Sequence, residues 1–254
     1  MENKGIYRLC TYFIIYSVVG FFIETIYALI VYHVIESRQS FLYGPFCAIY
    51  GLGAVLMIIT LERYSKNNIK LFLGGIVVGA IAEYLMSFLG EKLFGMRFWD
   101  YSGKILNING RICLLYSCYW GLAAFVLIKY VNPKIDGLIN KYINNENKMK
   151  IGKIVVVFLI IFMIWDCLIT YTAINYFIVE SAHKFDLKLK DAKQVEAIYN
   201  YAQQRPVVKK VLSGIATTER IMLIFPNIVT ILEDGTQIKL HDLTPNVRNC
   251  YYRF

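Results

Sequence analysis

The stretch Ile154–Val179 reads IVVVFLIIFMIWDCLITYTAINYFIV and carries one charged side chain, that of Asp166. An α-helix needs about 20 predominantly apolar residues to cross the hydrocarbon core of a bilayer. Further apolar blocks precede this run, at Tyr7–Val34, Phe41–Leu61, Leu71–Leu93 and Ile112–Val131. The sequence therefore predicts an all-α integral membrane helix bundle of about five transmembrane helices within residues 1–180.

The composition supports this class. Of the 254 residues, 57% are hydrophobic and only 18% are charged, whereas soluble domains are about 25% charged. The net charge of +9 would suggest nucleic acid as a partner of a soluble protein. Here Lys and Arg gather in the loops and no nucleic-acid-binding motif is present, so the bilayer is the expected partner and nucleic acid is not.

Metal and cofactor chemistry has no support in the sequence. The six cysteines form no Cys-x-x-Cys pair, and His33, His183 and His241 stand apart without metal-ligand spacing. Phosphate-binding P-loop, Gly-x-Ser-x-Gly and His-Glu-x-x-His patterns are also missing. We predict no metal, no cofactor and no nucleotide hydrolysis by this chain itself, and an enzymatic role is not favoured.

Residues 181–254 differ from the apolar part and are predicted to form a small extramembrane module. Asp186–Gln204 is polar and favours a helix. Ile228–Leu232 and Gln237–Leu240 flank Asp234-Gly235, which supplies the positive φ angles of a tight hairpin turn. The alternative is that the tail hides a poorly marked sixth span.

Prolines and asparagines predict several helix boundaries. The second helix should begin near Pro45, because proline fits the first turn of a helix. Asn132-Pro133 predicts that the fourth helix ends before these residues. Lys134–Asn145 then shows apolar residues at helical spacing, which indicates either an interfacial helix or one packed on its neighbours. At the start of the fourth helix, Asn109 is predicted as the cap, with Arg111 in the first turn.

Loop charges predict the orientation. With five spans, the amino end and the loops at residues 62–70 and 129–153 share one side and hold eleven Lys and Arg residues. The short loops on the other side hold five. The positive-inside rule then places the amino terminus in the cytoplasm and the C-terminal module outside. Glu24 and Glu83 would lie in the outer half of the bilayer.

The third apolar block carries small and polar residues at steps of four, on one helix face: Gly75, Gly79, Glu83, Ser87 and Glu91. Small residues let another helix approach closely, so Glu83 should point into a helix contact rather than at lipid. The Gly75–Gly79 pair by itself is explained equally well by packing alone.

Ionisable groups inside spans are candidate functional residues, although each acid could instead be protonated or paired for structural reasons. Arg111 could bind an anion at a helix start or neutralise one of the acids. The predicted solute-binding residues are Glu24, Glu83, Asp100 and Arg111. The residues expected to add to the same pocket are Pro45, Tyr50, Trp99, Tyr101, Asn107 and Asp166.

Several motifs together resemble a known family. They are Phe41-Leu42-Tyr43-Gly44-Pro45-Phe46-Cys47-Ala48-Ile49-Tyr50-Gly51, Phe98-Trp99-Asp100-Tyr101, Asn107-Ile108-Asn109-Gly110-Arg111-Ile112-Cys113-Leu114 and Trp120-Gly121. Their order is similar to that in the CmpB-like family of ABC-transporter type IV permeases, over roughly residues 10 to 130. Phe225-Pro226-Asn227 is similar to the tails of some members.

The resemblance implies a multi-spanning membrane protein of the permease type. The chain departs from the family where Ser37-Arg38-Gln39-Ser40 replaces the usual Asn-Arg-Gly, so only Arg38 carries over. It also lacks the Glu-Ala-Ala motif by which ordinary ABC permeases engage their ATPase. If ATP drives transport, a separate ATPase subunit must supply the energy.

Three functions remain open at this point. The first is a transport component that binds solute in an outward-facing polar pocket. The second is a membrane enzyme that acts on a lipid or lipid-linked substrate, with paired carboxylates as acid and base and Arg111 on a phosphate. The third is a sensor or assembly factor whose external module binds a partner.

Overall fold

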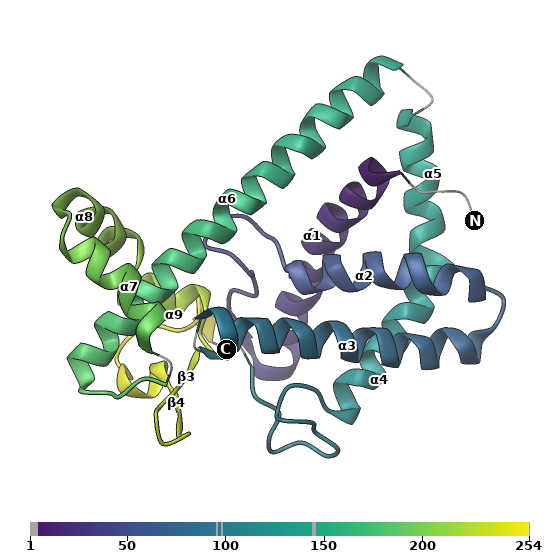
Figure 1. The fold of residues 1–254 in the computed structure, drawn as a ribbon. Helices are drawn as coiled ribbons and strands as arrows, with labels where there is room; N and C mark the ends of the chain where they lie inside the picture. Colours follow the sequence, from purple (N-terminus) through teal and green to yellow (C-terminus); the bar gives the residue numbers. More distant parts are fainter. Residues whose placement is uncertain (1–4, 95, 98, 144–145, 191, 254) are drawn as a thin grey trace. The chain divides into compact units, whose positions relative to one another are not determined.

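The computed structural model describes residues 5–94, 96–97, 99–143, 146–190 and 192–253. Phe98 and Asn145, which belong to predicted motifs, lie outside this set. The helices are α1 Ile6–Tyr32, α2 Ala48–Leu61, α3 Asn68–Phe94, α4 Leu114–Val126, α5 Asn132–Ile143, α6 Glu146–Phe185, α7 Ala192–Gln203, α8 Pro206–Ile215 and α9 Thr218–Ile224 (Figure 1). The strands are β1 Val34–Ile35, β2 Met96–Arg97, β3 Val229–Ile231, β4 Gln237–Lys239 and β5 Tyr252–Arg253.

The predicted helical membrane fold is confirmed. Among the described residues, four helical segments are long and apolar enough to cross a bilayer: Ile6–Tyr32, Asn68–Lys92, Leu114–Tyr142 and Glu146–Phe185. The second apolar block forms only the 14-residue helix α2. At 1.5 Å per residue α2 is about 21 Å long, shorter than the hydrocarbon core of about 30 Å.

The chain forms two compact units. The first unit contains the described residues up to Phe21, together with Pro45–Met86 and Tyr101–Ile164. The second unit contains Phe22–Gly44, Ser87–Asp100 and the residues from Trp165 onward. The predicted division at residue 180 stays a prediction.

In the first unit, small residues bring helices into close contact. A Cβ atom placed at Gly79 would overlap the Cβ of Trp120, and one at Gly75 would overlap the Cβ of Ala124. The stripe on α3 therefore packs against α4, as the small-residue spacing predicted. On α1, Gly20 meets Tyr50 of α2 in the same way.

Helix α2 starts later than predicted. Pro45 precedes the helix, which begins at Ala48 with Cys47 as its N-cap residue. The Cys47 N–H donates to the carbonyl oxygen of Ser17 at 2.8 Å, and the Cys47 ψ of 89° is not helical. This contact with the middle of α1 determines where α2 begins, and no local sequence pattern encodes it.

The predicted stop at Asn132-Pro133 is wrong. The chain passes from α4 through a π-helical turn at Leu127–Val131 directly into α5, with Pro133 in its first turn. A π turn shifts the hydrogen-bond ladder, so the missing N–H of the proline does not break the helix. Helix α5 lies against the start of α1: the Tyr16 hydroxyl donates to Asn132 Oδ1 at 3.0 Å, and Asp136 accepts from the Tyr12 hydroxyl.

In the second unit, the carboxyl-terminal half of α6 packs with α7, α8, α9 and the hairpin around one apolar core. The β3–β4 hairpin confirms the predicted turn, because Ile231 pairs with Gln237 and Gly235 has a φ of 84°. Two strand pairs were not predicted. Strand β2 adds to β3, and β5 returns to pair with β1 beside the end of α1.

Candidate functional site

Glu83 is buried in the first unit, with 5% of its surface exposed. Its Oε1 accepts a hydrogen bond from the Tyr101 hydroxyl at 3.1 Å. The Tyr101 ring in turn stacks on Tyr116 of α4, with ring centroids 4.6 Å apart. A buried acid of α3 is therefore held by an aromatic side chain from the loop that connects α3 to α4.

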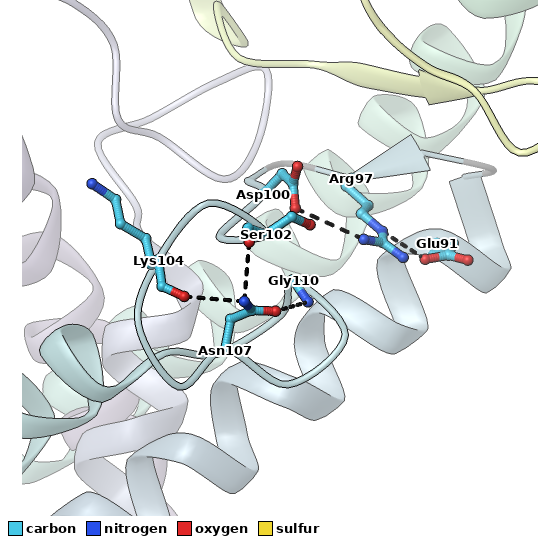
Figure 2. A network of polar contacts seen from close by, with 7 residues as sticks. All are labelled: Glu91, Arg97, Asp100, Ser102, Lys104, Asn107 and Gly110. Atoms are coloured by element: carbon cyan, nitrogen blue, oxygen red, sulfur yellow. Dashed lines mark hydrogen bonds and ion pairs between the residues drawn. The ribbon is translucent and has the colours of Figure 1, made fainter.

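This loop is built around Asn107. The Asn107 side-chain amide donates to the carbonyl oxygens of Ser102 and Lys104, each at 3.0 Å, and its Oδ1 accepts from the Gly110 N–H at 3.2 Å (Figure 2). The Tyr101 N–H also donates to the Gly110 carbonyl at 2.8 Å. Asn107 thus organises the loop backbone, and it brings the two loop ends that carry Tyr101 and Arg111 together.

Arg111 lies at the end of this loop and is also buried, with 6% exposed. Its guanidinium carbon is 5.6 Å from the ring centroid of Tyr84, the residue that follows Glu83 on α3. Asn109 donates to the Tyr84 hydroxyl at 2.9 Å. The buried cation therefore contacts the residue of α3 that follows the buried acid.

The predicted start of the fourth helix is wrong. Helix α4 begins at Leu114 with Cys113 as N-cap, so Arg111 lies before the helix and not in its first turn. Asn109 does not cap the helix but adopts a φ of 54° in the preceding turn. The prediction failed because Ile108 pairs with Ile112 across that turn, which holds residues 108–112 in a non-helical conformation.

Asp100 belongs to a different network, in the second unit. Arg97 of β2 donates through Nε to Glu91 at 2.8 Å, and its Nη1 lies 4.0 Å from Asp100 Oδ1 (Figure 2). Trp99 between them is half-buried. Each member of this ion-paired group lies at the end of α3 or just after it.

Glu24 also lies in the second unit, half-buried on α1. Burial raises the pKa of the nearby Glu36 carboxyl above its ordinary value. The charges of Arg38 and Arg253 oppose this rise, and the charge of Glu24 adds to it. Glu36 and Arg38 form an ion pair. Glu36, just after α1, is thus an electrostatic neighbour of Glu24.

Asp166 and Thr170 contact irregular backbone in the second unit. Both Asp166 carboxylate oxygens accept from the Tyr43 N–H, at 3.0 and 3.2 Å. The Leu42 N–H donates to Thr170 Oγ1 at 2.8 Å, and the Thr170 hydroxyl donates to Asp166 at 3.3 Å. Asp166 and Thr170 are buried in α6, the longest apolar helix. They serve as acceptors for backbone that has no helical or strand partner.

Two predicted pocket residues remain, Pro45 and Tyr50. Pro45 is exposed in the bend before α2. Tyr50 packs on Trp120, with ring centroids 5.4 Å apart. Glu83, Tyr101, Asn107 and Arg111 lie together in the first unit, whereas Glu24 and Asp100 lie in the second. The predicted four-residue pocket stays a prediction.

Sequence reasoning missed two tyrosines that contribute to the Glu83 region, Tyr84 and Tyr116. Helical spacing could have found Tyr84, because it precedes Ser87 by three residues, but an aromatic residue in a span is ordinarily interfacial or packed. Within the described part of the chain, no group of three or more His, Cys, Asp or Glu side chains is placed to hold a metal ion.

The comparisons with known proteins agree with this architecture. A family model with the description "Putative ABC-transporter type IV" matches residues 11–171. The chain belongs to this family. The match to the type IV ABC-transporter family runs from α1 to the Asp166–Thr170 segment of α6, so it includes both buried acids of the spans α3 and α6. No curated protein and no solved structure matches the chain.

Proposed function

We propose that this protein is the membrane-spanning component of a transporter and that it binds a small polar solute beside Glu83 and Arg111. The observation that carries the proposal is that Glu83 of α3 and Arg111 are both buried, and that the Arg111 guanidinium lies 5.6 Å from the ring of Tyr84, the next residue of α3. Ionisable groups inside a membrane bundle are costly and commonly mark binding sites or translocation paths. Tyr101 donates to Glu83, Tyr116 stacks on Tyr101, and the Tyr84 ring lies beside the Arg111 guanidinium.

If a solute binds at this site, Glu83→Gln should lose the stabilisation that the solute gives to the wild type. A solute at 100 times its dissociation constant stabilises the native protein by about 2.7 kcal/mol. Removal of a charged hydrogen-bonding partner weakens binding by about 10- to 100-fold. We expect a screen of amino acids, amines and organic anions to find a solute that raises the unfolding temperature of the wild type and has little effect on Glu83→Gln.

Glu91→Gln is the matched control, since Glu91 lies on the same helix but pairs with Arg97. This variant should retain the full thermal shift. Tyr101→Phe should bind more weakly, because it removes the hydrogen bond to Glu83. Equal thermal shifts in the wild type and Glu83→Gln, for every solute that stabilises, would contradict the proposed site.

We further propose that a separate ATPase subunit binds on the cytoplasmic side, at α5. The loop-charge count, taken with five spans, favours the cytoplasm for the amino terminus and α5 and the outside for the C-terminal module. Hydrogen bonds from Tyr12 and Tyr16 tie α5 to the start of α1, so these two segments share a side. Leu138 and Tyr142 of α5 are 57% and 55% exposed, which leaves an apolar face for a partner.

This proposal predicts that an ATPase co-purifies with the tagged protein from native membranes. Leu138→Asp combined with Tyr142→Asp should reduce the recovered ATPase at least tenfold, since two apolar contacts of about 1.5–3 kcal/mol each are lost. Recovery is measured by mass spectrometry and ATP hydrolysis. Asn200→Asp, at an exposed position of α7, is the control and should retain the ATPase. Absence of any ATPase in the wild-type preparation would contradict the transporter proposal, whereas unchanged recovery with the α5 variant would contradict only the docking position.

A further inference from the structure

An open apolar groove of about 550 Å³ lies in the second unit, between α6, α7 and α8. Thr172 of α6, Tyr201 of α7 and Val207, Val211 and Leu212 of α8 are among the residues that line it. Thr172 therefore gives the position of the groove along α6. The groove is separate from the Glu83 region, whose residues all belong to the first unit.

The length of α6 places this groove at one boundary of the hydrocarbon core. The apolar run of α6 begins at Ile154, after Lys153. Thr172 lies 18 residues further, or about 27 Å at 1.5 Å per residue. The hydrocarbon core is about 30 Å thick, so a span that enters at Ile154 reaches the opposite interface near Thr172.

Exposed apolar side chains of α6 lie on the same helix face as Thr172 of the groove. Trp165 and Leu168 are 48% and 62% exposed on the part of α6 that precedes Thr172. On α8, Val207 and Val211 are 76% and 52% exposed and lie four residues apart, on one helix face. A water-soluble module would ordinarily bury such residues. Continuity with the exposed surface of a spanning helix indicates that lipid covers them.

Basic residues flank this apolar face. Lys209 and Lys210 are exposed on the other side of α8. Arg205, just before α8, places its guanidinium carbon 3.8 Å from the ring centroid of Tyr201. A helix with aliphatic residues on one face and lysines on the other has the pattern of helices that lie in the bilayer interface. The cations would meet anionic head groups.

We propose that α7 and α8 lie in the bilayer interface and that the groove holds an acyl chain of an anionic phospholipid. The occupant is a lipid of the surrounding membrane, with its chain against Val207 and Val211 and its phosphate near Lys209, Lys210 and Arg205. Tyr201 lies between the acyl-chain region and the phosphate region, since its ring lines the groove and contacts the Arg205 guanidinium. This inference does not depend on the transport proposal.

Photo-crosslinking of the full-length protein tests the inference. Benzoylphenylalanine replaces Val211 in one variant and Ser213 in a matched control, which lies on the opposite face of the same helix and is exposed. Both variants are placed in nanodiscs of equal parts phosphatidylglycerol and phosphatidylcholine and irradiated. The mass of the intact protein is then measured by mass spectrometry. We expect a mass increase of one phospholipid at position 211 and little or none at position 213, with phosphatidylglycerol favoured.

Replacement of both lysines, Lys209→Gln and Lys210→Gln, should reduce the phosphatidylglycerol preference by about fivefold per lysine, while crosslinking to lipid persists. A doubled mass from position 211 would overturn the proposal in favour of a second copy of the chain. Unmodified protein at position 211, or equal lipid adducts at 211 and 213, would also overturn it. An unchanged lipid preference in the lysine variant would overturn the head-group contact.

Discussion

Asp166→Leu is expected to unfold much of the protein at temperatures where the wild type is stable. The substitution leaves the Tyr43 N–H and the Thr170 hydroxyl without their acceptor, in a buried part of α6. Each buried donor that loses its acceptor costs about 1–3 kcal/mol in proteins, and more where lipid excludes water. A loss of about 2–6 kcal/mol is therefore expected. Thermal unfolding in detergent, followed by size-exclusion chromatography, measures it.

Two further variants separate the hydrogen bond from the charge and from packing. Asp166→Asn retains one oxygen that can accept from Tyr43, so it should cost only about 1 kcal/mol. Leu168→Ala, at an exposed position two residues away, should change stability by less than about 0.5 kcal/mol. If Asp166→Leu were as stable as the wild type, the acceptor role of Asp166 would be refuted.

Gly79→Val is expected to separate α3 from α4. The added Cβ alone would overlap the Cβ of Trp120, and both atoms belong to helices whose backbones are held by their own hydrogen bonds. Overpacking of a tight interior contact costs about 1–3 kcal/mol, and more where backbone must move. The variant should lower the unfolding temperature strongly, and it should also disturb Glu83, which lies one turn further along the same face.

Gly137→Val is the matched control for this prediction. A Cβ at Gly137 of α5 would meet no atom within 4 Å. Valine and glycine differ in helix propensity by a few tenths of a kcal/mol, so stability should stay within about 0.5 kcal/mol of the wild type. Similar losses in Gly79→Val and Gly137→Val would show that β-branching, and not the α3–α4 contact, causes the effect.

Local sequence patterns were sufficient to predict that the long apolar helices and the hairpin exist. An apolar run such as Ile154–Val179 requires a span wherever it occurs, and Asp234-Gly235 favours a tight turn regardless of its surroundings. Helix starts at Ala48 and Leu114 were missed because distant or cross-turn partners determine them. The Ser17 carbonyl is not visible in a local window, whereas the Ile108–Ile112 pair spans an Asn109-Gly110 turn that the interpretation of Asn109 as a helix cap overlooked.

The candidate site was predictable in part for the same reason. The cost of a charge inside a span singled out Glu24, Glu83 and Asp166 from the sequence. Glu83 and Asp166 are buried, whereas Glu24 is half-buried. Their partners could not be predicted. Tyr101 reaches Glu83 because Asn107 organises a loop of many hydrogen bonds, and Asp166 meets backbone 123 residues earlier in the chain.

The same separation along the chain affects the order in which the protein can assemble. The amide groups of Leu42 and Tyr43 find their acceptors 128 and 123 residues later, on α6. During synthesis, the irregular segment before α2 therefore emerges long before the side chains that satisfy its backbone. Lipid cannot supply these hydrogen bonds in the meantime. The segment therefore stays in contact with water or with the insertion machinery until α6 has been synthesised. The backbone before α2 reaches its final structure only after α6 is in place.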